Sequence, residues 1–327
     1  MKSYKLISVL LFSSTLLSCT NSSNIVKISA WGNDVSSTLT VLESGLFNGE
    51  KYDYVASSYP VISSAMQNNS KLSIFEDITK KFSSKYEVNG FPQAGLFINK
   101  KLEDNTVIKD EISSFLSMFD SSVEKLLNED KSFVDIMNKY STDLGKQTDY
   151  FGFNSKLLNN MLQGNKMAFI SNKNNPSLEE LNKVGEILEF TLKKESISSY
   201  YLSDSTYKES DYSKYKISVP FGAPAASLLP FIFDYNDTLN NNILFTTPLN
   251  IRTSLLSGNQ DFVIFDSLTG MNISDNYKLV RLLTYGNLHL ISLGNDSNNS
   301  VDSEDKIYAY GQELIPGKVV KSVYEKE

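Results

Sequence analysis

Few side chains in this chain could carry out covalent catalysis or hold a transition metal. Its 327 residues include one histidine, His289, and one cysteine, Cys19. Ser–His and Cys–His nucleophile systems need a histidine base beside the nucleophile, and zinc sites are built mainly from several His and Cys ligands. His289 lies between Leu288 and Leu290, a pattern typical of an alternating strand. We therefore expect no catalysis, no metal site and no cofactor.

Noncovalent binding asks for less, namely an apolar or aromatic wall and a few polar groups that orient the ligand. Such groups follow several strand-like runs, and in open α/β sheets ligands bind at the carboxyl ends of strands. A glycine turn at residues 222–225 would offer backbone N–H groups at a helix start, although a plain tight turn is equally compatible. Ser267 and Thr269 could bind ligand or cap a helix. The candidate ligand-binding residues at strand ends are Gly222, Ala223, Pro224, Ser267, Thr269, Tyr285, Asn287, Gln312, Ser57, Ser58 and Tyr59.

The N-terminus is typical of an exported lipoprotein. Lys2 and Lys5 precede an uncharged, mostly apolar run of about 12 residues, shorter than the roughly 20 that cross a membrane. The sequence Leu-Leu-Ser-Cys that ends at Cys19 resembles the lipobox, in which the cysteine becomes the lipidated first residue. We expect a signal peptide at 1–18, a lipidated tether at 19–24 and a lipid-anchored location on the extracellular face of the cell membrane. The alternative for Cys19 is an inert, buried thiol.

The charge pattern excludes one class of partner. The formal net charge is −7, and loss of Lys2 and Lys5 with the signal peptide would take it to −9. Arg252 and Arg281 are the only arginines, and no basic stretch with interleaved aromatic residues occurs. The sequence therefore indicates no nucleic-acid partner.

Strand-like runs alternate with helical patterns, which favours an α/β fold with parallel βαβ units. Apolar residues recur at helical spacing over residues 108–127, 133–140 and 178–188, and Ser177 with Glu180 forms a capping-box pattern before the last of these. Residues 196–213 and 295–304 are polar and read as linkers. Strands are predicted at 26–31, 52–57, 94–99, 216–220, 243–247, 261–266, 278–283, 288–293 and 306–310.

The order of these elements repeats. Residues 216–267 read strand, helix, strand, helix, strand. The same order appears again if the C-terminal elements at 306–324 are placed before the N-terminal elements at 26–58. This predicts two similar α/β lobes with a cleft between them, the second lobe completed by both chain ends. The strands at 26–31 and 306–310 should then lie in one sheet.

These segments resemble the type II solute-binding lipoproteins of ABC importers, a class that includes thiamine-precursor, nitrate and sulfonate binding proteins. Gly222-Ala-Pro-Ala225 resembles the family's first strand-to-helix turn, and Thr284-Tyr-Gly-Asn287 resembles the approach to its first crossover between lobes. Phe91-Pro-Gln-Ala-Gly-Leu-Phe-Ile-Asn-Lys100 resembles the strand that returns to the first lobe, which makes Gln93 a further candidate for ligand binding. Before Pro60 the family usually has Glu, whereas this chain has Tyr59, which puts the role of that position in doubt.

The resemblance covers nearly all of the mature chain, but in permuted order. The family's N-terminal lobe begins here near Tyr215, and its C-terminal helices end near Lys194. It thus implies a two-lobed periplasmic-binding-protein type II fold with a ligand cleft between the lobes and a permuted chain order. The second lobe would comprise residues 25–91 and 303–327, and the first lobe residues 92–302 with the linker at 196–213.

The resemblance further implies a monomer that captures a small organic solute, such as a pyrimidine or thiamine precursor, by hinge closure and delivers it to an ABC permease. Two alternatives stay open. A surface lipoprotein could act as an adhesin or scaffold without transport, which the permuted order and Tyr59 favour. An enzyme of thiamine-precursor synthesis could use the same fold, which the export signal and the scarcity of His and Cys disfavour.

Overall fold

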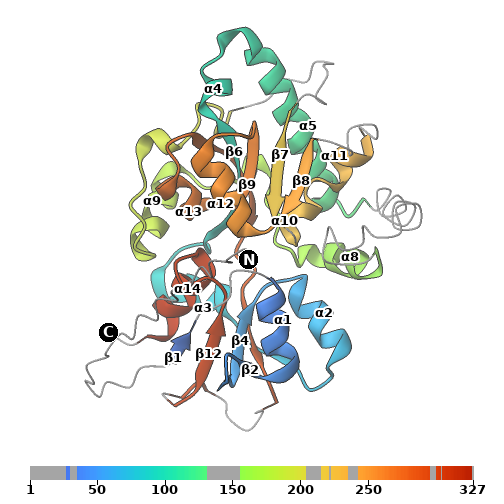
Figure 1. Ribbon diagram of the computed structural model, residues 1–327, viewed down its shortest axis with the longest axis vertical. Helices are drawn as coiled ribbons and strands as arrows, with labels where there is room; N and C mark the ends of the chain where they lie inside the picture. Colours follow the sequence, from blue (N-terminus) through green and yellow to red (C-terminus); the bar gives the residue numbers. More distant parts are fainter. Residues whose placement is uncertain are drawn as a thin grey trace, which may run out of the picture.

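The computed structural model describes residues 27–29, 35–130, 155–203, 215–220, 222–234, 242–294, 300–302 and 304–325. The expected signal peptide and tether and the helix predicted at 133–140 lie outside these residues. The described chain is α/β, with two five-stranded mixed sheets and a small two-stranded pair, β2 (Leu46–Phe47) with β3 (Glu50–Lys51) (Figure 1). No helix in this part of the chain combines the length and hydropathy needed to cross a membrane.

The first sheet has the strand order β10–β6–β9–β7–β8. Its strands are β10 (Tyr277–Tyr285), β6 (Pro92–Asn99), β9 (Phe262–Asp266), β7 (Ile217–Pro220) and β8 (Ile243–Thr246). β7 runs parallel to β8 and β9, whereas β6 is antiparallel to both β9 and β10. The central strands read as continuous apolar runs because helices cover both faces of the sheet.

Alternation of side chains along β6 and β9 divides the core of this sheet into two layers. Leu96 and Ile264 pack on one face, against α5 (Lys109–Leu127) and α11 (Leu229–Asp234). Phe97 and Val263 pack on the other, against α9 (Leu178–Ile187), α12 (Pro248–Ser257) and α13 (Ser267–Ile273). The helix α9 begins at the predicted capping box, in which Ser177 Oγ accepts from Glu180 N and the Glu180 carboxylate accepts from Ser177 N.

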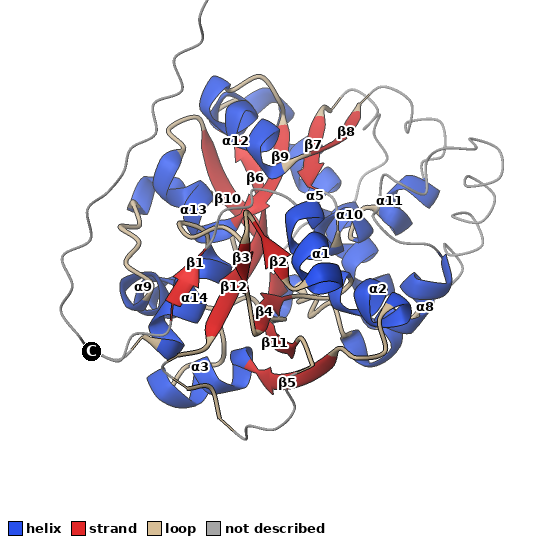
Figure 2. Ribbon diagram, turned by 60° about the horizontal axis from the view of Figure 1, so that its bottom comes forward, coloured by secondary structure: helices blue, strands red, loops and turns tan. Residues whose placement is uncertain are grey.

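The second sheet has the order β1–β12–β4–β11–β5. Its strands are β1 (Lys27–Ser29), β12 (Lys306–Ala309), β4 (Tyr54–Ser57), β11 (His289–Ser292) and β5 (Ser73–Asp77). Helices α1 (Val35–Ser44) and α2 (Val61–Asn68) cover one face, and α3 (Ile78–Tyr86) and α14 (Ile315–Tyr324) cover the other (Figure 2). Helices therefore cover both faces of the second sheet as well.

The two sheets share one strand order. Each has three parallel strands, then an antiparallel strand that enters from the other sheet's part of the chain, then an outer strand. Thus β8–β7–β9–β6–β10 corresponds to β1–β12–β4–β11–β5. The predicted pairing of the strands at 26–31 and 306–310 is confirmed, because β1 is parallel to β12 with Lys27 opposite Lys306.

Two segments connect the sheets and lie against each other. Residues 78–91, which include α3, lead from β5 to β6, and residues 286–288 lead from β10 to β11. The Gly286 N–H donates to Phe91 O over 2.8 Å. Leu288 N donates to Thr79 Oγ1 over 3.0 Å, and Thr79 N donates to Leu288 O over 3.2 Å. The connection between the sheets is thus a pair of hydrogen-bonded crossover segments.

The predicted lobe boundary at residue 302 differs from the strand pairing. It assigns residues 288–293 to the first lobe, but β11 pairs antiparallel with β4 and β5 in the second sheet. The chain changes sheets at residues 286–288 instead. An apolar run that is buried on both faces fits either sheet equally well, so periodicity could not place this strand.

The predicted linker at 196–213 is only partly open. Tyr200 and Tyr201 are buried, and Ser198 N donates to Leu279 O of β10. Arg281, whose side chain is 1% exposed, donates to Tyr200 O and forms an ion pair with Asp120 at 2.8 Å. The polar composition predicted a linker because backbone and charge-assisted hydrogen bonds, which leave no periodic apolar pattern in the sequence, hold these residues in place. Residues 204–213 lie outside the described part.

Candidate functional site

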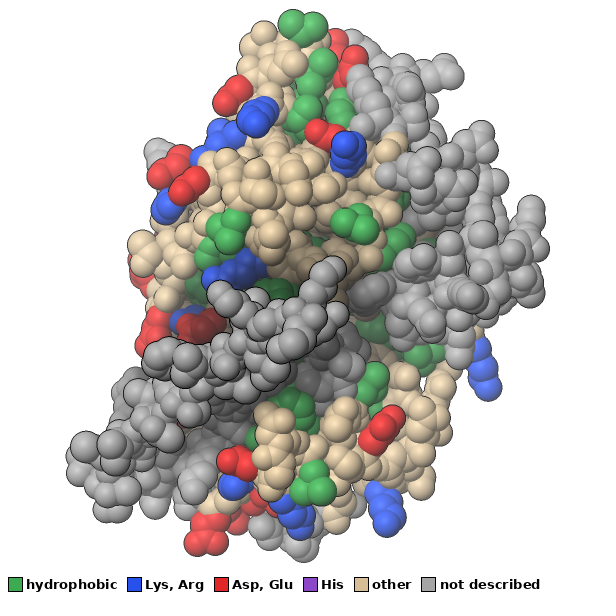
Figure 3. Space-filling view, in the orientation of Figure 1, with side chains coloured by type: hydrophobic (Ala, Val, Ile, Leu, Met, Phe, Trp, Pro, Cys, Tyr) green, Lys and Arg blue, Asp and Glu red, His purple; other side chains and the backbone are tan. Residues whose placement is uncertain are grey.

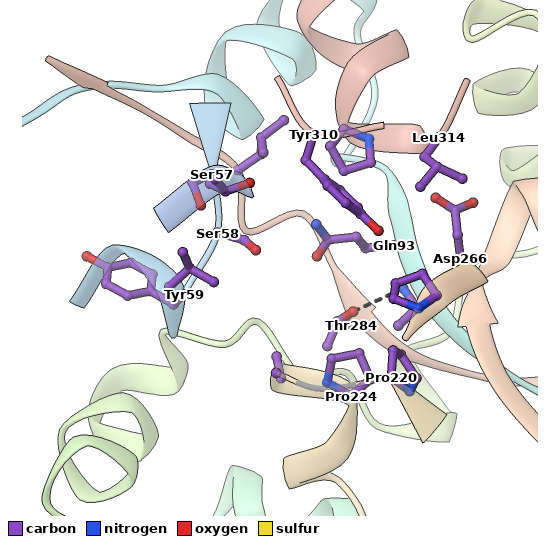
Figure 4. A pocket seen from close by; sticks show the side chains of 18 of the residues that line it. Ser57, Ser58, Tyr59, Gln93, Pro220, Pro224, Asp266, Thr284, Tyr310 and Leu314 are labelled. Atoms are coloured by element: carbon purple, nitrogen blue, oxygen red, sulfur yellow. Dashed lines mark hydrogen bonds between the residues drawn. The ribbon is translucent and has the colours of Figure 1, made fainter. Parts of the chain in front are cut away.

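A cavity of about 170 Å³ lies between the two sheets. Its wall comes from both: from the segments that follow β4 and β12 on one side, and from those that follow β7, β8 and β9 on the other. The carboxyl ends of parallel strands in the two sheets therefore face one space, which is where open α/β sheets bind ligands. Figure 4 shows Ser57, Ser58 and Tyr59 opposite Pro220 and Pro224 across this space.

Seven of the predicted binding residues line the cavity. They come from three places: the end of β4, the start of β6, and the turn from β7 into α10 (Ala223–Ala226). At that turn Gly222 has φ +100, a conformation that side-chain-bearing residues rarely adopt, so glycine suits this sharp entry into the helix. The seven are Ser57, Ser58, Tyr59, Gln93, Gly222, Ala223 and Pro224.

The other five predicted residues do not line it. Asn287 supports the wall from behind, because its Oδ1 accepts from Tyr59 N and its Nδ2 donates to Tyr59 O, each over 3.2 Å. Tyr285 packs against Gly90, and burial raises its pKa to about 12. Ser267 and Thr269 are buried in the first turns of α13, and Gln312 is exposed before α14. A strand end brings a residue near the site but does not fix where its side chain points.

Prolines form much of the wall, and the sequence reasoning missed most of them. Five of the eight prolines in the chain line the cavity, and four of these stand at helix starts. Proline suits the first turn of a helix because its missing N–H would be unpaired there. The result is a rigid wall with few backbone donors. The five are Pro60, Pro220, Pro224, Pro248 and Pro316.

Asp266 is a second residue that the sequence reasoning missed. It ends β9, and its Oδ1 caps α13 by accepting from Thr269 N over 2.9 Å. Its Oδ2 accepts from Ile315 N over 2.9 Å, at the start of α14 on the other sheet. Burial raises the pKa of Asp266 to about 6, and the hydrogen bonds from Thr269 and Ile315 offset this only in part. An aspartate between a strand and a helix start was the signal that could have revealed it.

The remaining polar groups on the cavity wall are uncharged. Tyr310 and Gln93 extend into the space beside Thr284, whose Oγ1 accepts from Ala94 N over 3.1 Å (Figure 4). Among the described residues that line the cavity, Asp266 alone carries a carboxylate, and none is Lys or Arg. The site can therefore orient a ligand through hydroxyl and amide groups and one carboxylate.

His289 lies outside the cavity wall. It begins β11, inside the strand predicted at 288–293, and its ring meets the edge of the Tyr59 ring at 5.3 Å between centroids. Burial lowers its pKa. No group of three or more His, Cys, Asp or Glu side chains in the described ranges is arranged to hold a metal ion.

Comparisons with known protein families, with curated proteins and with solved structures find no match. We therefore infer function from the cavity, from the strand order of the two sheets and from the N-terminal sequence.

Proposed function

We propose that this protein is an extracytoplasmic solute-binding lipoprotein of an ABC importer, with a permuted type II periplasmic-binding-protein fold. One observation carries the proposal: a cavity lies between two sheets of identical strand order, at the carboxyl ends of strands from both. A ligand in such a cavity contacts both halves at once. We expect it to be a small organic solute such as a pyrimidine or thiamine precursor.

Hinge closure is the mechanism that this arrangement supports. The two crossover segments at 78–91 and 286–288 are the covalent links between the sheets, and they hydrogen-bond to each other. A rotation about them would separate Asp266 from Ile315 and open the cavity. A ligand that contacts both halves binds the closed form better, and so shifts the population by that difference in affinity.

The N-terminal sequence supports a lipid anchor at Cys19. About eight residues separate Cys19 from β1, and an extended chain covers at most roughly 3.5 Å per residue, which gives a reach of about 28 Å. The second sheet would therefore stay close to the membrane, beside an ABC permease.

On the face that Figure 3 shows, acidic and basic side chains are interspersed rather than gathered into a patch of one sign.

A thermal-shift screen of the chain from residue 25 onward tests solute capture. The panel contains pyrimidines, thiamine, sulfonates and amino acids. A ligand at 100 times its Kd should stabilise the protein by about 2.7 kcal/mol. Ser58→Trp would fill the cavity and should abolish the response, whereas Gln67→Trp, on the exposed face of α2, should leave it intact.

Absence of a response across the panel would count against solute capture. It would favour the alternative of a surface lipoprotein that serves as an adhesin or scaffold. An equal response in the wild type and in Ser58→Trp would place binding outside the cavity and so contradict the proposed site.

A further inference from the structure

In the part of the chain that the structure describes, the cavity wall contains one formally charged side chain. Of the described residues that line the cavity, Asp266 is the one with a formal charge at neutral pH, and the rest contribute methyl groups, rings, hydroxyls and an amide. Prolines at the helix starts remove N–H donors that could otherwise hold an anion. The wall therefore offers one negative charge and few groups that could stabilise a negatively charged ligand.

The Asp266 carboxylate has no cationic partner among the described residues. The backbone N–H groups of Thr269 and Ile315 donate to it, one to each oxygen, and the Thr269 side chain adds a further favourable interaction. A carboxylate accepts at about four lone-pair sites, so this one keeps capacity for a further donor. The raised pKa of Asp266, caused by burial, agrees with a charge that neighbouring side chains leave uncompensated.

The size of the cavity and its aromatic side chains narrow the class of ligand further. Its volume of about 170 Å³ is close to the roughly 150 Å³ of an apolar cavity that accommodates benzene in another protein. Tyr310 extends toward the same space as Gln93 and Asp266, and phenol rings attract cations through their π faces (Figure 4). The net charge, −7 for the full chain and −9 without Lys2 and Lys5, also favours approach of a cation.

We propose that the ligand of this cavity is a compact organic cation, about one six-membered ring in size, whose positive charge pairs with Asp266. This inference rests on the proposed solute-binding function and names its substrate class. It makes Asp266 a specificity-determining residue, because its carboxylate is the counter-charge of the ligand while its hydrogen bond to Ile315 joins the two halves.

Two probes of equal shape and different charge test the proposal. At pH 7.5, 4-aminopyridine carries one positive charge at its protonated ring nitrogen, whereas aniline, which has a C–H group in place of that nitrogen, is neutral. Titration calorimetry on the lipid-free wild type should give a Kd at least about tenfold lower for 4-aminopyridine, because a charge pair in a partly desolvated site is worth more than in water. This comparison needs no variant, so it does not depend on the folding of a mutant.

The isosteric variant Asp266→Asn should reduce that preference to about twofold or less while circular dichroism confirms the fold. Asp77→Asn is the matched control, because Asp77 also caps a helix, accepting from Lys80 N over 3.1 Å, but lies outside the cavity wall. It should keep the preference for the cation.

Three results would overturn the proposal: equal affinity for both probes, binding of neither, or an unchanged preference in Asp266→Asn. With any of these results, the proposed solute-binding function would still hold if the wider thermal-shift panel revealed a neutral or anionic ligand. A panel without any ligand would instead contradict the proposed function itself.

Discussion

At the scale of single residues, Asp266 should make stability depend on pH. Its pKa rises from 3.8 to about 6 on folding, so the folded chain binds this proton more tightly than the unfolded chain does. Its contribution to the free energy of unfolding therefore falls by about 3 kcal/mol as pH rises from below the unfolded pKa to above the folded pKa. Asp266→Asn abolishes this titration. The unfolding free energy of the variant minus that of the wild type, measured in urea, should therefore be about 2 kcal/mol larger at pH 7.5 than at pH 4.

Asp275 supplies a control of opposite sign. Its pKa is lowered by the hydrogen bond and charge of Lys193, so the stability that it contributes is present at neutral pH and is lost as pH falls through its folded pKa. Asp275→Asn should therefore lose stability relative to the wild type at pH 7.5 but not at low pH. If both variants showed the same pH trend, burial would not raise the pKa of Asp266 as described.

The buried arginine illustrates a different residue-scale role. Arg281 pairs with Asp120 through Nε and Nη2, at 2.8 and 3.1 Å, and its donors also fix the backbone at Tyr200. Asp120→Ala would leave this charge buried without its carboxylate, which costs about 3–5 kcal/mol. The loss should appear in chemical denaturation. A loss below about 1 kcal/mol would mean that water reaches the guanidinium.

At the scale of elements, the crossover at 286–288 depends on a glycine. Gly286 has φ +84, and a Cβ there would lie 2.6 Å from Thr79 Cγ2 on the other crossover. We expect Gly286→Ala to destabilise the fold by about 1–3 kcal/mol more than Gly49→Ala, where φ is +80 but no atom lies within 4 Å of the added Cβ. Urea unfolding of both variants measures the difference.

A second substitution isolates the contact. Thr79→Ser removes the Cγ2 methyl but keeps the hydroxyl that accepts from Leu288 N. In the double variant Thr79→Ser with Gly286→Ala, most of the extra loss should therefore be recovered. Simple additivity of the two substitutions would argue that the crossovers do not pack as described.

At the scale of the whole molecule, closure should change the dimensions of the particle. Small-angle scattering on the lipid-free chain should show a smaller radius of gyration at ligand saturation, because the two sheets approach when a ligand contacts both. The measurement uses a ligand identified by the thermal-shift panel. Identical dimensions with and without that ligand would contradict hinge closure.

The anchor also belongs to this scale. Cys19→Ser should abolish labelling by radioactive palmitate and move the protein from the membrane fraction to the soluble fraction, because a serine cannot form the thioether-linked lipid. Ser18→Ala, a small residue at the neighbouring position, should keep both properties. Retention of Cys19→Ser in the membrane fraction would point to a different attachment.

The sequence by itself determined the local elements and their order. Apolar periodicity located most helices and strands, the capping box located the start of α9, and the repeated order of elements predicted that β1 and β12 share a sheet. It also identified seven residues that line the cavity, because the carboxyl ends of neighbouring parallel strands lie at the same edge of a sheet. These features are local, or follow from the order of elements, so they can be read without coordinates.

The tertiary structure alone decided which half β11 joins, which strand-end side chains point inward, and that Asp266 meets Ile315 across the two sheets. The reason is physical. An apolar run buried on both faces carries no signal for its neighbours, and a side chain's direction depends on packing from residues far away in the sequence. The charge of the cavity, and with it the class of ligand that we propose, likewise became visible only when distant segments were brought together.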